Sequence, residues 1–157
     1  MKRILTLTLA IASLAAPALA AGAMATYANA RFGYSISYPA ALFTAERESD
    51  NGDGRVFRAR SGGAEIRVWG AYNAANATPV QLADEAQGDC LRKPASYRVA
   101  KPGLVAISCD TAQGVLYEKQ LIHRDTITAV MITYPAAERS RWDPVVTQVA
   151  NSLHAPK

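Results

Sequence analysis

Few residues of this sequence have the types and spacing needed for catalysis. The only histidines are His123 and His154, at the end of an apolar segment and in the C-terminal tail. A Ser-His-Asp hydrolase needs a nucleophile, a base and an orienting acid close together. The sequence also contains no Gly-x-Ser-x-Gly, His-Glu-x-x-His or phosphate-binding glycine motif. We therefore predict no catalytic residue and no cofactor.

Carboxylates occur close together at two places, Asp84-Glu85 and Glu46-x-Glu48, where solvated helix and loop charges are the simpler interpretation. The segment 50–54, Asp-Asn-Gly-Asp-Gly, offers oxygen atoms that suit a hard cation, but it lacks the full ligand spacing and distal glutamate of a calcium loop. The same residue types favour turns. We predict no metal site, although the sequence does not exclude cation binding by this loop.

A third candidate site is a surface that combines Arg58, Arg67 and Trp69. The strands expected to carry it are 55–60 and 64–71, and a two-residue turn at Gly62-Gly63 would join them. That turn places Phe57 opposite Val68 on the core face. The other expected pairs are Ala59 with Ile66, Arg60 with Glu65, Arg58 with Arg67, and Val56 with Trp69.

Arginines directly opposite each other repel unless an anion or an acidic neighbour lies between them. Trp69 could stack on a sugar or cap a protein partner. We thus predict partner binding by Arg58, Arg67 and Trp69, with an envelope protein or a saccharide as the unknown partner. The alternative is an exposed strand pair that Glu65 neutralises, or a face covered by another element.

The N-terminus has the pattern of an export signal. A cationic start is followed by an apolar run at 4–16 and by Ala18-Leu19-Ala20, a small-x-small cleavage pattern. We predict a signal peptide over residues 1–20, cleaved after Ala20, and a mature protein in the periplasm or medium. The alternative is an N-terminal membrane anchor, but the run is shorter than the about 20 residues of a membrane span. No later segment is apolar and long enough to span a membrane.

Composition fits one globular domain over residues 21–157, since the whole chain has 157 residues and is 50% hydrophobic. The whole chain has 17 basic and 13 acidic residues. Removal of Lys2 and Arg3 with the signal peptide leaves 15 basic and 13 acidic residues in the mature protein. A charge so close to neutral gives no reason to expect a nucleic acid partner.

Export also favours a disulfide between the two cysteines, Cys90 and Cys109. The alternative, free or catalytic thiols, lacks the usual Cys-x-x-Cys spacing. Residues 78–81, Thr-Pro-Val-Gln, form a capping box that begins a helix, and helical spacing places Cys90 on its buried stripe. Cys109 shares a strand face with Val105 and Ile107, so the bond would join helix to sheet.

Other segments complete an α+β fold. Strands are expected at 32–38, 96–100, 104–110, 115–123 and 127–134. In the last two, large apolar residues occupy both faces, as in strands covered on both sides. A final helix is expected to begin with Asp143 as its cap. The predicted architecture is a mostly antiparallel β-sheet flanked by helices.

Three segments resemble the PsbP-like group of small secreted bacterial proteins, which are relatives of the photosystem II extrinsic protein PsbP. They are Asn51-Gly52-Asp53-Gly54, Tyr134-Pro135 and Tyr27-x-Asn29-x-Arg31-Phe32-Gly33-Tyr34-Ser35-Ile36-x-Tyr38-Pro39. The resemblance implies an α/β/α sandwich and an accessory or binding role. We therefore expect an exported, non-enzymatic binding or accessory module of the bacterial cell envelope. A small periplasmic hydrolase with an unrecognised site and a purely structural module are the alternatives.

Overall fold

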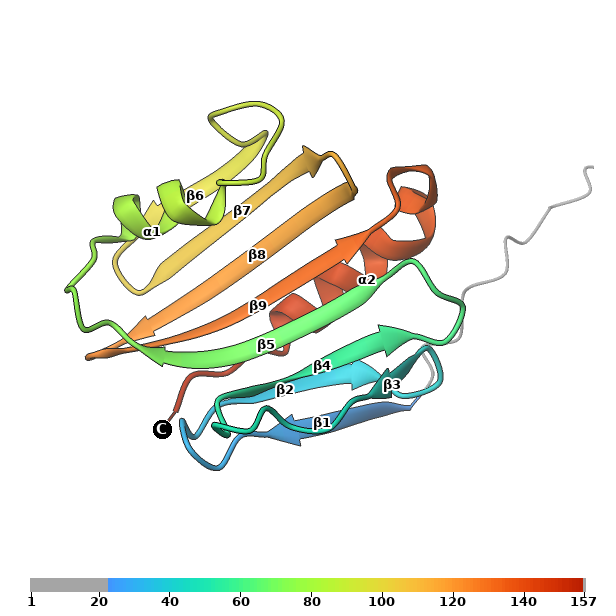
Figure 1. Cartoon of the computed structure of the whole chain (residues 1–157), viewed down its shortest axis with the longest axis horizontal. Helices are drawn as coiled ribbons and strands as arrows, with labels where there is room; N and C mark the ends of the chain where they lie inside the picture. The colour runs from blue at the N-terminus through green and yellow to red at the C-terminus, as the bar shows by residue number, and fades with distance from the viewer. Residues whose placement is uncertain (1–22, 157) are drawn as a thin grey trace, which may run out of the picture.

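The structure, a computed structural model, describes residues 23–156, so the expected signal peptide at 1–20 lies outside it. Within the described residues, nine strands and two α-helices make up the fold (Figure 1). In chain order they are β1 (Met24–Ala28), β2 (Ser35–Pro39), β3 (Phe43–Ala45), β4 (Gly54–Ala59), β5 (Glu65–Tyr72), α1 (Pro79–Ala86), β6 (Tyr97–Lys101), β7 (Leu104–Thr111), β8 (Gly114–His123), β9 (Thr126–Tyr134), the short 3-10 helix η1 (Ala136–Glu138) and α2 (Arg139–Asn151).

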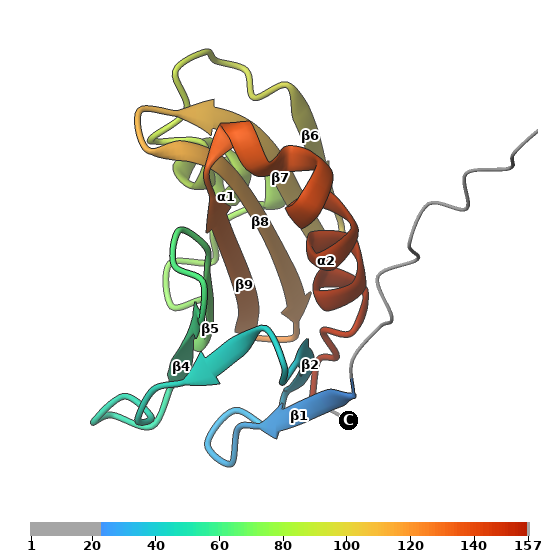
Figure 2. The ribbon, with the colours of Figure 1, turned by 90° about the vertical axis from the view of Figure 1, so that its right-hand side faces the viewer.

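Seven strands form one sheet in the order β3-β4-β5-β9-β8-β7-β6, and every neighbouring pair is antiparallel. The remaining strands, β1 and β2, form a separate hairpin. Figure 2 shows α2 and this hairpin on one side of the main sheet, with α1 on the other. The predicted α+β fold, a mostly antiparallel sheet flanked by helices, is confirmed.

The sheet is buried on both faces at its centre. Val115 and Ile132 belong to the core beneath α2 and the β1–β2 hairpin. Leu116 and Met131, one position away on the same strands, pack in the core beneath α1. The expectation of cover on both sides of β8 and β9 is therefore confirmed, because successive side chains of a strand point to opposite faces.

The expected start of the last helix is wrong. Helix α2 begins at Arg139, so Asp143 lies inside it and accepts a 2.6 Å hydrogen bond from the Tyr134 hydroxyl. The cause is Trp142, which is 1% exposed and packs on Phe43 with 5.6 Å between ring centroids. Burial of this indole favours a helical turn before Asp143.

The capping box of α1 is as predicted, since the Thr78 side chain accepts from the Gln81 backbone and the Gln81 side chain accepts from the Thr78 backbone. However, the helix ends at Ala86, so the placement of Cys90 on its stripe is wrong. Cys90 lies in the following loop, still buried, and forms a disulfide with Cys109 of β7. The bond therefore joins the loop after α1 to the sheet.

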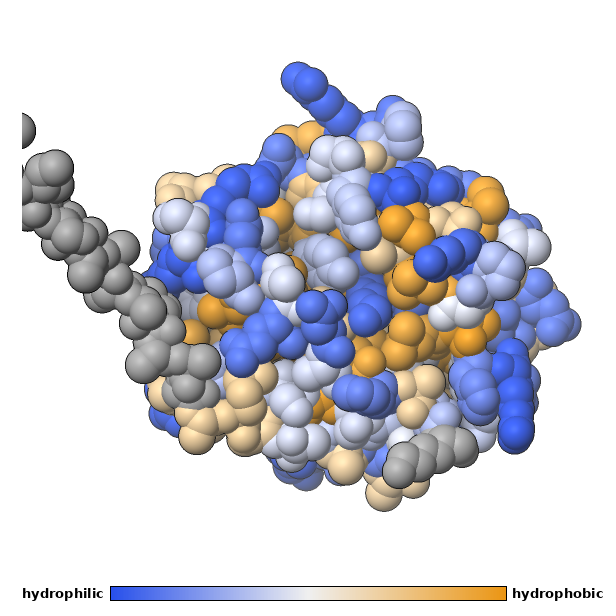
Figure 3. Space-filling model, turned by 180° about the vertical axis from the view of Figure 1, so that it is seen from behind, coloured by the Kyte–Doolittle hydropathy of each residue, from blue (hydrophilic) through white to orange (hydrophobic). Residues whose placement is uncertain are grey.

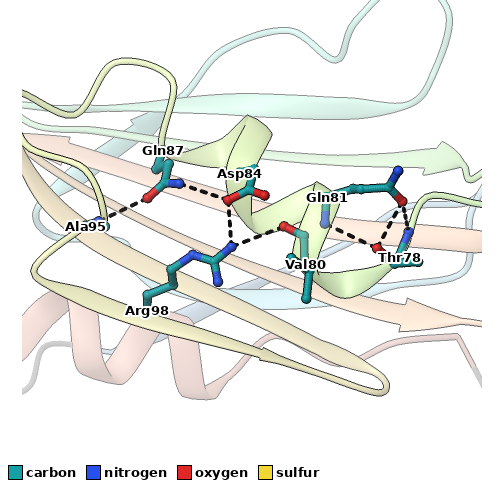
Figure 4. Close-up of polar contacts among 7 residues, drawn as sticks. All are labelled: Thr78, Val80, Gln81, Asp84, Gln87, Ala95 and Arg98. Atoms are coloured by element: carbon teal, nitrogen blue, oxygen red, sulfur yellow. Dashed lines mark hydrogen bonds and ion pairs between the residues drawn. The ribbon is translucent and has the colours of Figure 1, made fainter.

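Polar contacts also hold α1 against β6 (Figure 4). Arg98 Nη2 donates to Asp84 Oδ1 at 2.7 Å and to the Val80 carbonyl at 3.2 Å. Gln87, just beyond the helix, donates to Asp84 and accepts from the Ala95 backbone at 3.0 Å. These bonds and the disulfide fix α1 over the β6–β7 end of the sheet.

Each face of the seven-stranded sheet is covered only in part. The uncovered strands lie at opposite ends of the sheet on the two faces. On the α1 side, no helix or strand of the described residues lies over β4 and β5 (Figure 1). On the α2 side, β6 and β7 present Tyr97, Val99 and Leu104, and Tyr97 is 50% exposed. Figure 3 shows hydrophobic side chains at the surface on this second side, interspersed with polar ones.

Candidate functional site

The pairing of β4 with β5 determines which side chains meet on the uncovered face. Arg58 is opposite Glu65, and Val56 is opposite Arg67. The expected two-residue turn and the Arg58–Arg67 pair are therefore wrong. A four-residue loop, 60–63, joins the strands instead, closed by hydrogen bonds from Ala59 N to Ala64 O and from Gly62 N to Ala59 O.

This loop needs residues that adopt positive φ, and Gly62 and Gly63 have φ of 77° and 80°. The register consequently shifts by two residues from the expected one. Since side chains alternate with a period of two, the shift leaves each residue on its predicted face. Phe57 and Ile66 are accordingly buried, whereas Arg58 and Arg67 lie outward.

Glu65 neutralises both outward arginines, as the alternative interpretation of the sequence proposed. Arg58 Nη1 donates to Glu65 Oε2 at 2.5 Å, and Arg67 Nη2 donates to Glu65 Oε1 at 2.9 Å. Arg58 also pairs through Nε with Glu46, and this hydrogen bond is the main reason its pKa is raised. Within residues 23–156, Arg58 therefore pairs with two carboxylates and Arg67 with one.

Trp69 is half-buried, and its cross-strand neighbours on the outward face are Gly54 of β4 and Ala129 of β9. Neither has a side chain large enough to cover an indole. The Trp69 indole N–H makes no hydrogen bond with any residue of the described chain, whereas Trp142 Nε1 donates to Glu138 at 2.9 Å. The Trp69 ring therefore keeps an accessible flank and a free donor.

A cavity of about 580 Å³ lies beside this indole. Trp69, Arg67, Val56 and Met131 line it from the sheet, and the β3–β4 loop supplies polar side chains. Those loop residues are Glu46, Arg47, Ser49 and Asp53.

A second cavity of about 350 Å³ adjoins the first, because Arg67 and Met131 line both. It extends toward the loop after α1, which contributes Asp89, and toward Thr133 of β9 and Thr111 of β7. We call the two cavities together the β4–β5 groove. Trp69 and Arg67 of the predicted surface lie in it, and Arg58 stands outside its lining.

The 50–54 loop forms a hydrogen-bonded turn. Asp53 accepts from Ser49 Oγ at 2.6 Å and from Asn51 Nδ2 at 2.7 Å, and the Ser49 bond is the main cause of its lowered pKa. Asp50 pairs with Arg47. Within residues 23–156, no group of three or more His, Cys, Asp or Glu side chains is arranged to hold a metal ion.

The remaining titratable candidates are dispersed. His123 ends β8 and lines a different cavity of about 220 Å³, while the His154 ring contacts the Ser152 carbonyl at 2.7 Å. Of the neighbouring carboxylates, Asp84 binds Arg98, and Glu48 accepts from the Tyr27 hydroxyl. The structure thus brings none of the paired carboxylates together with a histidine.

The sequence did not single out Gly54, Ala129 or Met131, which shape the groove around Trp69 and Arg67. Met131 and Ala129 meet β5 only through its pairing with β9, a contact between segments about sixty positions apart. The apolar alternation of β9 was recognisable, but alternation alone does not identify the neighbouring strand. Gly54 was visible only as part of a turn-forming segment.

The arrangement of sheet, hairpin and helices is the PsbP-like fold. The solution structure of cyanobacterial PsbP (CyanoP) from Synechocystis sp. PCC 6803 matches 89% of this chain and 96% of its own with a TM-score of 0.60 and 14% sequence identity. A crystal structure from Bacteroides thetaiotaomicron VPI-5482 matches 87% of this chain and 49% of its own, with a TM-score of 0.52 and 13% identity. The likeness shows the fold alone.

No family model matches the sequence, and no curated protein matches it either. Neither helix in the part of the chain described has the length and apolar character required to cross a membrane.

Proposed function

We propose that this chain is an exported, non-enzymatic binding module whose ligand lies in the β4–β5 groove. The observation that carries the proposal is Trp69, a large aromatic side chain between Gly54 and Ala129 whose indole N–H makes no hydrogen bond within residues 23–156. Aromatic side chains with one apolar face and one polar atom are typical of recognition surfaces. Arg67, half exposed beside it, adds directed donors.

Binding rather than catalysis is favoured by the state of the groove's carboxylates. In the cavity beside Trp69, Glu46 is paired with arginine and Asp53 accepts hydrogen bonds from its own loop. In the second cavity Glu65 is paired with arginine too, and Asp89 is the fourth carboxylate. A general acid or base instead needs a pKa near the operating pH and a free path to substrate. Asp53 has a lowered pKa, which is the opposite of what an acid catalyst requires.

Export is supported by the signal pattern at residues 1–20 and by the Cys90–Cys109 disulfide, which is compatible with an oxidising compartment. We expect the mature chain to begin at Ala21 and to occur in the periplasm or medium. Intact-mass measurement of the protein after cell fractionation checks this. Recovery of the full-length chain with membranes would contradict it.

The groove is tested by site-specific photo-crosslinking in the exported protein. A photoreactive residue in place of Val56, which lines the groove, should give defined adducts with an envelope component. The same residue at Tyr97, on the opposite face, serves as the control. Adducts from Val56 should be lost in the Trp69→Ala background, with circular dichroism confirming an intact fold. Identical adducts from both positions, or adducts unaffected by Trp69→Ala, would refute the proposal.

A further inference from the structure

We propose that the β4–β5 groove binds a neutral, chain-like saccharide of at least two sugar units, with one unit stacked on Trp69. This inference rests on the proposed binding function and specifies its ligand. It follows from three properties of the groove: the flank of the indole, the balance of charges in the lining, and the adjoining cavities.

The indole supplies a platform for a sugar ring. A pyranose has a face of C–H groups, which packs favourably on an aromatic ring, and hydroxyls at its rim. Gly54, the β4 neighbour of Trp69, lines the same cavity and has no side chain that could cover the ring. The β5 backbone fills its side-chain position, since a Cβ on Gly54 would lie 2.0 Å from the Val68 carbonyl oxygen. The indole N–H, which has no partner in the part of the chain that the structure describes, can donate to a sugar hydroxyl.

The charged residues of the lining argue against a polyanion. Four acidic and three basic residues line the two cavities: Glu46, Asp53, Glu65, Asp89, Arg47, Arg55 and Arg67. The Arg55 guanidinium, however, lies over the Tyr27 ring, 4.9 Å from its centroid. Because Arg58 and Arg67 are already paired with Glu46 and Glu65, the groove offers an acidic polymer no excess of positive charge. Hydroxyl groups, which both donate and accept, can instead bind carboxylate and guanidinium alike. Ser49 and Thr133 add further hydroxyl partners.

The extent of the groove indicates a chain rather than a single sugar. The cavity beside Trp69 continues past Arg67 and Met131 into the second cavity, where Thr133 and Asp89 lie. Arg67 and Met131 are directly paired across β5 and β9, so they mark the junction of the two cavities. A ligand that fills both must cross this junction.

An extended peptide is a poorer fit to the same surface. Peptides that bind sheets commonly pair their backbone with an exposed edge strand. The groove crosses the interior of the sheet, where β5 is already paired with β4 and β9. A peptide would therefore leave its backbone groups without the partners that a strand edge supplies.

The experiment is titration of residues 21–157 with linear neutral oligosaccharides of increasing length, made of glucose, N-acetylglucosamine or mannose units. Tryptophan fluorescence reports on Trp69, because Trp142 is 1% exposed, and calorimetry gives the affinity. One series should bind, with an affinity that rises from the monosaccharide to a short oligomer and then levels off. Binding should depend little on salt, unlike that of charged ligands. Oligogalacturonate serves as the acidic comparison and should bind more weakly.

Two variants and a control connect binding to the groove. Trp69→Ala should weaken the affinity by about tenfold or more, as expected for an aromatic anchor, and Trp69→Phe should retain part of it. Tyr97→Ala removes an exposed aromatic side chain from the other face and should leave the affinity unchanged. Failure of all the neutral series, tighter binding of oligogalacturonate, or full binding by Trp69→Ala would overturn the inference. If the photoreactive residue at position 56 crosslinks to a protein instead, the saccharide inference is overturned, but the proposed binding function still holds.

Discussion

Arg58 on β4 lies directly opposite Glu65 on β5, and its Nη1 donates a hydrogen bond to Glu65 Oε2 at 2.5 Å. Glu46 engages the same guanidinium from the other side. Arg67 shares Glu65 but extends into both cavities of the β4–β5 groove. Two arginines on one face thus have separate roles: Arg58 joins β4 to its neighbours, and Arg67 is available to a ligand.

The first prediction separates these two arginines. Arg67→Ser should reduce ligand capture by the groove by about tenfold, the effect of losing one interfacial charged hydrogen bond. Arg58→Ser should reduce capture far less, because its side chain lies outside the lining and its ion pairs are exposed. Both proteins should retain the circular dichroism spectrum of the parent. Equal losses of capture from the two single variants would contradict this division.

The second prediction concerns Cys90 and Cys109, separated by 19 positions and bonded in the structure. The reduced and alkylated protein should gain mass at both cysteines, whereas the native protein should not react. Replacing both by serine should lower the free energy of unfolding by about 3 kcal/mol, since the bond restricts a loop of the unfolded chain. Two reactive thiols in freshly isolated native protein would refute the prediction.

Local patterns were sufficient to predict the sheet and its two cores. Val115 and Leu116 each point to the expected core because alternation of apolar residues encodes the face directly. The Thr78 cap likewise depends on contacts within four residues. Features determined within one strand or one helical turn can thus be predicted from this sequence.

Features that depend on contacts between distant residues could not be predicted from the sequence. Two consecutive glycines allow both a two-residue and a four-residue connection, and only pairing across the sheet selects Arg58 with Glu65. The start of α2 depends on burial of Trp142 against Phe43, about a hundred positions away. Accordingly, the sequence predicted Arg67 and Trp69 on one face but not the cavities between them.

The third prediction tests how the β1–β2 hairpin is seated. Gly70 of β5 lies beneath Phe32, and a Cβ at this position would lie 2.4 Å from the Phe32 ring. Gly70→Ala should therefore lower the free energy of unfolding by about 1–3 kcal/mol, as overpacking does in cores. Chemical denaturation measures the loss.

The matched control for Gly70→Ala is the same substitution in a Phe32→Ala background. With the Phe32 ring removed, the added methyl should lower the free energy of unfolding much less. The effects of the two substitutions on this free energy should therefore be strongly non-additive. Equal costs of Gly70→Ala in both backgrounds would show that contact with Phe32 is not the cause.

The last prediction concerns Glu118, which is 6% exposed on the α1 side of β8. Burial raises its pKa, although Gln120 Nε2 donates to Glu118 Oε1 at 2.6 Å and partly offsets the effect. Because the folded protein holds this proton more tightly than the unfolded chain, stability should fall as pH rises from the ordinary glutamate value through the raised pKa. The slope is at most about 1.4 kcal/mol per pH unit for one group.

Glu118→Gln removes the titration while keeping the shape of the side chain. The variant should be more stable than the parent at neutral pH, where the parent must bury a carboxylate, and the difference should shrink as pH falls. The new amide can donate to Gln120 Oε1, which is buried and has no partner among residues 23–156. Urea unfolding of both proteins from mildly acidic to neutral pH measures the difference. A stability difference that is constant with pH, or that favours the parent at neutral pH, would show that Glu118 is not buried as a charge.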